Sequence, residues 1–83
     1  MTKRDKLVQR FLSEPPEIDL EDVRNLLEMF GYTERKGSAS SHHSFVSSGK
    51  DRITVATVSG RMVKRTYIRL IIRALDLQSY LEK

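Results

Sequence analysis

The chain has 83 residues, of which 39% are hydrophobic and 31% are charged, as in an ordinary globular domain. This length suits one domain with one modest hydrophobic core. It contains no cysteine, which excludes disulfides, thiolate nucleophiles and cysteine-based zinc sites. No apolar run approaches the roughly 18 residues of a membrane span, and the charged beginning of the chain lacks the features of a secretory signal. We therefore expect a cytoplasmic protein with no membrane partner.

The net charge of +4 is distributed unevenly along the chain. Residues 35–73 contain nine basic residues and one acidic residue, whereas the first 33 residues contain five basic and seven acidic residues. A basic half of this kind favours a polyanionic partner, with nucleic acid as the first candidate and an acidic protein surface as the second. A solvated basic face without any partner is the alternative interpretation.

The first 30 residues predict two helices. Between residues 3 and 13 the apolar side chains recur on one helical stripe, and the two prolines at positions 15 and 16 end that helix. A second helix is predicted over about 20–30, with Asp19 as its N-cap and Gly31 just after its end. We interpret residues 1–16 as an N-terminal helical extension of a single domain that covers residues 1–83.

After Gly31 the apolar residues recur at every second position, which is the period of a β-strand. Three strands are predicted, over residues 32–36, 42–48 and 52–58, with a turn at 48–51 between the last two. Strict alternation gives the sheet one apolar and one polar face. The expected fold is therefore α+β, with a three-stranded antiparallel sheet and helices packed on one of its faces.

The alternation also separates the two histidines of the chain. Phe45 is the obvious inward-facing residue of the second strand, so His43 should share its face. His42 should then lie at the beginning of the strand and point away from the helices. A β-bulge in this region would reverse the two positions.

The C-terminal part predicts another helix. Residues 58–62 are interpreted as a loop, and from about Lys64 the apolar residues return to helical spacing. Arg65, Arg69 and Arg73 follow one another at four-residue intervals on the opposite side, without acidic residues between them. Like charges at this spacing repel one another by a few tenths of a kcal/mol per pair, which favours an anionic partner, with simple solvation as the alternative.

The chemistry of the chain is concentrated in residues 36–45, which contain one glycine, three serines before His42, both histidines and Ser44. Serine and glycine on a loop supply hydroxyl and backbone donors, and histidine, with an ordinary pKa of about 6.5, exchanges protons near neutrality. This combination suits phosphate chemistry. Two adjacent histidines without a third ligand at helical spacing make a weak metal site, so we expect neither metal nor cofactor. A serine-rich hairpin loop without function is the alternative.

The most specific signal is a Lys-Gly-Ser run followed by a histidine that opens a strand, with an aromatic residue three positions later. Together with the hairpin and the following helix, this makes residues 19–77 resemble the HicA family of toxins, which are mRNA interferases of bacterial and archaeal toxin–antitoxin pairs. The aromatic residue, Phe45, selects His42 as the histidine of the motif. Residues 39–41 lengthen the loop relative to the commonest form of the motif, which leaves His43 as the alternative. The resemblance agrees with the double-stranded-RNA-binding-domain-like order of elements, α-β-β-β-α.

The resemblance implies the toxin of a type II toxin–antitoxin pair, an endoribonuclease that cleaves mRNA without a metal. His42 would be its acid–base residue, and the products would be a 2′,3′-cyclic phosphate and a 5′-hydroxyl. It also implies a cognate antitoxin of the HicB type that covers the His42 site. Positive charge must stabilise the transition state of such a reaction, and the predicted substrate-binding residues are Lys36, Ser38, Ser41, Lys50, Arg52 and Lys64.

Two other functions fit the same residues. The first is a non-catalytic RNA-binding module of the same topology, which would bind RNA in a salt-sensitive manner without cleaving it. The second is a protein-interaction adaptor, whose stripe of Arg65, Arg69 and Arg73 docks an acidic partner.

Overall fold

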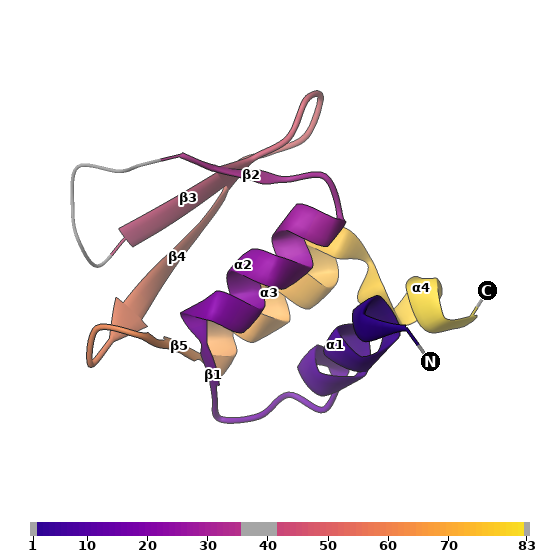
Figure 1. Ribbon diagram of the computed structural model, residues 1–83, viewed down its shortest axis with the longest axis horizontal. Helices are drawn as coiled ribbons and strands as arrows, with labels where there is room; N and C mark the ends of the chain where they lie inside the picture. Colours follow the sequence, from indigo (N-terminus) through magenta and orange to yellow (C-terminus); the bar gives the residue numbers. More distant parts are fainter. Residues whose placement is uncertain (1, 36–41, 83) are drawn as a thin grey trace.

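The computed structural model describes residues 2–35 and 42–82 of the chain, with side chains up to Tyr80 (Figure 1). In chain order the elements are α1 (Lys3–Leu12), β1 (Glu17–Asp19), α2 (Leu20–Met29), β2 (Thr33–Arg35), β3 (His42–Val46), β4 (Ile53–Val58), β5 (Met62–Lys64), α3 (Arg65–Leu75) and α4 (Leu77–Glu82). None of the helices in the described residues is long and apolar enough to cross a membrane.

The strands form one antiparallel sheet in the order β1-β5-β4-β3-β2, and the helices lie on one side of it (Figure 1). This confirms an α+β fold with an antiparallel sheet and helices. The predicted number of three strands is too low, because the described sheet has five. Residues 62–64, which begin in the predicted loop and run up to the predicted helix, form β5, and residues 17–19 form β1. Each has only three residues, so alternation within the strand cannot mark it, and its identity comes from the pairing of Ile18 with Val63.

Local capping explains where the first two helices begin and end. Thr2 and Asp5 form a capping box at the start of α1, with the Thr2 hydroxyl accepting a hydrogen bond from the Asp5 backbone N–H at 3.1 Å. The Asp19 carboxylate accepts from the Glu21 N–H at 2.8 Å, which confirms the predicted N-cap of α2. Gly31 follows this helix with a φ of +90°, a conformation that glycine adopts without the steric cost of a Cβ.

The hairpin of β3 and β4 carries both histidines. Its register pairs His42 with Ala56 and Phe45 with Ile53. The two strands are joined through residues 47–52, where the Lys50 N–H donates to the Ser47 carbonyl at 3.1 Å. The predicted turn at 48–51 lies within this connection.

The hydrophobic core lies between the sheet and the helices. Phe45 and Val55 of the sheet, Leu27 of α2 and Ile71 of α3 are completely buried. Val8 and Phe11 of α1 and Leu77 of α4 are also buried, so the N-terminal helix and the last helix close the same core. Because every described helix packs on this side, no described helix covers the other face of β3 and β4 (Figure 1). The position of the candidate site follows from this asymmetry.

Candidate functional site

The two histidines lie on opposite faces of β3. His42 is exposed and is paired with Ala56 of β4, on the face away from the helices. His43 shares the helix-facing side with Phe45, and only 19% of its side chain is accessible to solvent. The predicted alternation is therefore confirmed, and no bulge interrupts the pairing of residues 42–45 with residues 53–56.

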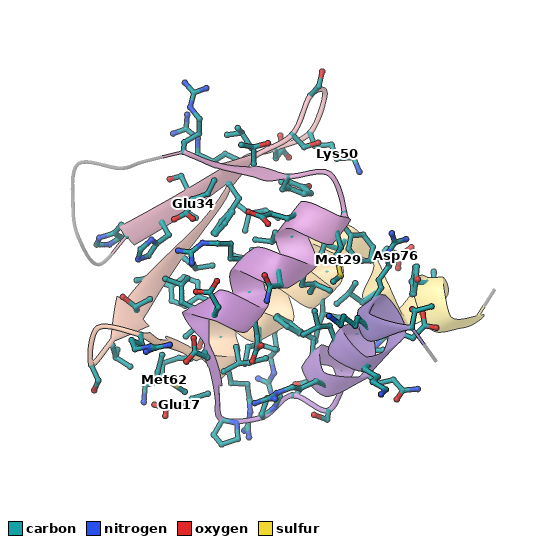
Figure 2. All side chains as sticks on the ribbon, in the orientation of Figure 1. Glu17, Met29, Glu34, Lys50, Met62 and Asp76 are labelled. Carbon is teal, nitrogen blue, oxygen red and sulfur yellow. The ribbon has the colours of Figure 1, made fainter. Side chains whose placement is uncertain are left out.

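A chain of polar contacts holds His43 in place. Glu34 lies on the helix side of β2 (Figure 2), where its Oε2 is 3.1 Å from Nδ1 of His43 and its Oε1 accepts from Nε of Arg24 at 2.6 Å. Arg24 also contacts Glu21, one turn earlier in α2, at 2.9 Å. The hydrogen bond from Arg24 is the main reason why the pKa of Glu34 is lowered, and Glu34 in turn raises the pKa of Arg24. Since Glu34 is ionised, Nδ1 of His43 must carry the hydrogen that it donates.

Hydroxyl and guanidinium groups accompany His42 on the open face. The hydroxyls of Ser44 and Thr54 are 3.3 Å apart across β3 and β4. Arg35 of β2 is exposed and is paired with Ser44, so it lies on the same face. Alternation alone places Ser44 and Thr54 on this face, but neither was predicted as a site residue. Arg35 was not predicted either, because its place depends on the register of β2 against β3.

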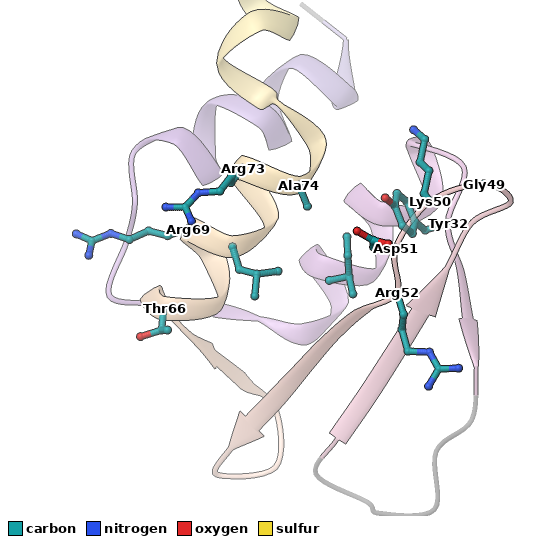
Figure 3. Close-up of a pocket in the computed structure, with 11 residues that line it drawn as sticks. Tyr32, Gly49, Lys50, Asp51, Arg52, Thr66, Arg69, Arg73 and Ala74 are labelled. Atoms are coloured by element: carbon teal, nitrogen blue, oxygen red, sulfur yellow. The ribbon is translucent and has the colours of Figure 1, made fainter.

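Two of the predicted phosphate-binding residues lie far from His42 along the hairpin. Arg52 is exposed just before β4, and its side chain points away from α3 (Figure 3). It lies four residues from Ala56, or about 13 Å along an extended strand. Lys50 is in the hairpin connection, with its Nζ 5.9 Å from the centre of the Tyr32 ring. The structure therefore does not bring Lys50 to His42, and it places Arg52 at the far end of the same face.

Lys64 lies closer to His42, but it already has a partner. Its Nζ is 3.2 Å from Oε2 of Glu17, its neighbour across β5 and β1. The register of β4 and β5, continued by one residue from the pair Thr57–Val63, puts Lys64 opposite Ala56. His42 is the partner of Ala56 on the other side, so the backbones of His42 and Lys64 are two strand spacings apart, about 10 Å. An exposed ion pair contributes only about 0–1 kcal/mol, so a phosphate can replace Glu17.

The remaining predicted substrate-binding residues, Lys36, Ser38 and Ser41, lie outside the described residues.

The arginine stripe of α3 has an acidic neighbour, although the sequence around it contains no acidic residue between the arginines. Glu14, in the connection after α1, accepts from Nε of Arg65 through its backbone carbonyl at 2.9 Å and from Nε of Arg69 through its carboxylate at 2.6 Å. The side chain of Arg73 is exposed, and its guanidinium makes no hydrogen bond or ion pair to the part of the chain that the structure describes. The acid that separates these charges is 55 residues away in sequence from Arg69, so inspection of the helix alone cannot reveal it.

The arrangement around His42 is suited to proton transfer beside a phosphate. An exposed imidazole, two hydroxyls and a guanidinium share one sheet face, with an ammonium group two strands away. Within residues 2–35 and 42–82, no group of three or more histidine, aspartate or glutamate side chains is placed to hold a metal ion.

Comparison with protein-family models, with curated proteins and with solved structures finds no match to this chain. The functional interpretation therefore depends on the geometry of the site and on the motif residues themselves.

Proposed function

We propose that this chain is the toxin of a type II toxin–antitoxin pair, an endoribonuclease of the HicA kind that cleaves mRNA without a metal. The observation that carries the proposal is the exposed position of His42 at the start of β3, on the sheet face that the described helices leave open. In sequence it directly follows the glycine- and serine-rich stretch that forms the family motif. His43 is the weaker candidate, because its Nδ1 is occupied by Glu34 on the opposite face.

The proposed reaction is an internal transesterification. The ribose 2′-oxygen attacks the adjacent phosphorus, forming the O2′–P bond and breaking the P–O5′ bond, so the products are a 2′,3′-cyclic phosphate and a 5′-hydroxyl. His42 takes the proton from the 2′-hydroxyl or gives one to the departing 5′-oxygen, and water exchanges the other proton. General acid–base catalysis by one positioned side chain contributes about 10²- to 10⁴-fold. Among the residues that the structure describes, Arg35 and Lys64 are the nearest cations on this face to balance the charge of the phosphorane.

The fold is consistent with this proposal. The segment from α2 to α3 runs α2-β2-β3-β4-β5-α3, which resembles the α-β-β-β-α order of a double-stranded-RNA-binding domain with the short strand β5 added before α3. In this interpretation α1 and α4 are additional packing around a HicA-like core at residues 19–77. A HicB-type antitoxin would cover the open face and with it His42. Since the proposed substrate is mRNA, the toxin would act in the cytoplasm.

One alternative uses the same face without catalysis. A non-catalytic RNA-binding module would place phosphates along the exposed side chains of Arg35 and Arg52 and would need no proton transfer. The adaptor alternative is weakened, because Glu14 already binds Arg65 and Arg69 of the stripe.

The test is cleavage of a single-stranded mRNA by the purified chain in EDTA, in parallel with His42→Ala and His43→Ala. We expect the wild type and His43→Ala to cleave, with cyclic phosphate termini, and His42→Ala to lose cleavage while it still binds the RNA. Circular dichroism of each variant shows that loss of activity is not loss of folding. Full cleavage by His42→Ala would overturn the assignment of the histidine. Salt-sensitive binding by the wild type without cleavage would favour the RNA-binding module.

A further inference from the structure

A second surface lies on the helix side of the molecule, between α3 and the hairpin of β3 and β4. There a groove of about 810 Å³ separates the exposed side of α3 from the beginning of β4 (Figure 3). Its floor is apolar and comes from Tyr32, Ile53, Leu70 and Ala74. A volume in the range of roughly 300–1,000 Å³ accommodates a small number of side chains. The groove can therefore hold the anchor residues of a docked segment.

Leu70 gives the floor of the groove an exposed apolar side chain. Leu70 is 43% accessible, and Val58 is the one other large hydrophobic residue exposed among the described side chains. Leu70 belongs to a row of exposed α3 residues at positions 66, 69, 70, 73 and 74. This spacing of i, i+3, i+4, i+7 and i+8 is the spacing by which one helix packs against another. The threonine and alanine at the two ends of the row are small, which allows close approach.

The rim of the groove is basic. Lys50, Arg69 and Arg73 contribute cations to its lining, and Arg52 borders it with a side chain that points away from α3 (Figure 3). Asp51 is the one acid among the lining residues that the structure describes. Arg69 is already paired with Glu14 at 2.6 Å, so the positive charge available to a partner comes mainly from Lys50 and Arg73. An apolar floor between basic edges is complementary to an apolar stripe between acidic edges.

The floor is better matched to a protein than to RNA. Single-stranded nucleic acids bind through bases stacked on exposed aromatic rings. Tyr32, the one aromatic residue of the groove, is 4% accessible and has Lys50 over its ring at 5.9 Å. The exposed aliphatic side chain of Leu70 offers no stacking platform, but it does accept leucine-like side chains.

The groove is also separate from the proposed RNA site. Ile53 lies on the helix-facing side of β4, whereas His42 lies on the opposite side and at the other end of the hairpin. A ligand in the groove and an RNA at His42 therefore use different side chains, except that Arg52 borders the groove and also lies at the far end of the open face.

We propose that this groove docks an acidic amphipathic helix of a protein partner. Its leucine-like residues pack on Leu70 and Ala74, and its carboxylates bind Lys50 and Arg73 at the two edges. The proposal is independent of the proposed function, because it requires no activity of His42 and does not use the open face.

The experiment titrates the ¹⁵N-labelled full chain with a synthetic helix of about 18 residues, long enough to be helical. The peptide carries leucine at i, i+3, i+4 and i+7 and glutamate on the flanks. We expect saturable shifts of the backbone amides of Lys50, Ile53, Leu70 and Ala74, and none at His42 or Ser44. A second peptide with glutamine in place of every glutamate should bind much more weakly, because the rim charges then have no partner.

Single substitutions identify the groove residues that contribute to peptide binding. Leu70→Asp and Arg73→Glu should each lower the affinity for the peptide by about tenfold or more. Lys6→Glu, the same charge reversal at an exposed position of α1, should change that affinity little. His42→Ala should bind the peptide as the wild type does, whatever the outcome for RNA cleavage, so this proposal and the proposed function can fail separately. Both exposed groove substitutions should leave the circular dichroism spectrum unchanged.

Three results would overturn the proposal: no saturable binding at millimolar peptide, equal weakening by Lys6→Glu and Arg73→Glu, or unchanged affinity of the Leu70→Asp variant. A single-stranded RNA with the same net charge as the peptide, titrated into the cleavage-deficient His42→Ala variant, should shift the backbone amide signals of the open face. Shifts of the groove amides by RNA, in place of the peptide, would assign the groove to nucleic acid instead.

Discussion

Glu34 Oε2 lies 3.1 Å from His43 Nδ1 across β2 and β3, and the adjacent His42 lies on the opposite face of the same sheet. The tandem histidines therefore occupy two different environments. His43 contacts Glu34, which also binds Arg24, on the helix side of the sheet, whereas His42 is exposed to solvent. From the different environments of the two histidines, and from the charged residues near them, we derive the expected outcomes below.

Substitution of the two histidines should separate activity from stability. His42→Ala should abolish the proposed cleavage, by about 10²-fold or more, and leave the free energy of unfolding within roughly 0.5 kcal/mol, as at other exposed positions. His43→Ala should destabilise the fold by about 1 kcal/mol, because half-buried Glu34 loses a hydrogen-bond donor. Urea unfolding of both variants measures this, and an equally large loss of stability in both would contradict the division.

The stability of the fold should depend on pH through Glu34. Its pKa is held below the ordinary value of 4.5, chiefly by the hydrogen bond from Arg24. A lowered pKa in the folded state means that the stabilisation is complete above about pH 4.5 and is lost as the pH falls through the folded-state pKa. Glu34→Gln should therefore be less stable than the wild type at pH 7, and the difference should shrink at pH 3. Asp19, whose pKa is also lowered, remains in both proteins as a common background. A difference that is the same at both pH values would contradict this assignment.

Alternation along β3 should be visible in stability. Phe45 is completely buried, so Phe45→Ala should cost about 3–5 kcal/mol. Ser44→Ala, one position earlier on the open face, should change the free energy of unfolding by less than about 1 kcal/mol, since its hydroxyl contact with Thr54 is exposed. Denaturant unfolding of the two single variants measures both. Comparable losses would mean that the strand is not oriented as described.

The cations of the open face should differ in their effect on RNA affinity. Arg35→Gln should reduce the slope of log affinity against log salt by about 0.7, the value for one phosphate contact on a single strand. Lys64→Gln should have a smaller effect, because Glu17 already neutralises Lys64. Lys6→Gln on α1 is the charge-matched control and should leave the slope unchanged. Fluorescence anisotropy at several salt concentrations, with uncleaving His42→Ala as the background, gives the slopes. An equal reduction by the control would show that binding depends only on net charge.

Local sequence predicted the features that depend on neighbouring residues. The helical spacing of apolar residues, the Asp19 cap and the prolines after α1 defined the helices, because a helix is built from contacts three and four residues apart. The same locality predicted the hairpin and the faces of His42, His43 and Phe45, since successive side chains of a strand point to opposite sides.

The tertiary structure decided the features that join distant residues. β1 and β5 are too short to be recognised as strands from the sequence. They are strands because they pair with each other, with Ile18 opposite Val63. The salt bridge of Lys64 with Glu17, the contact of Glu34 with His43 and the neutralisation of Arg69 by Glu14 likewise require packing of separate elements. The sequence shows how many charged side chains a segment contains. Only the fold determines which of those ions already have partners, because a partner 55 residues away leaves no local signal.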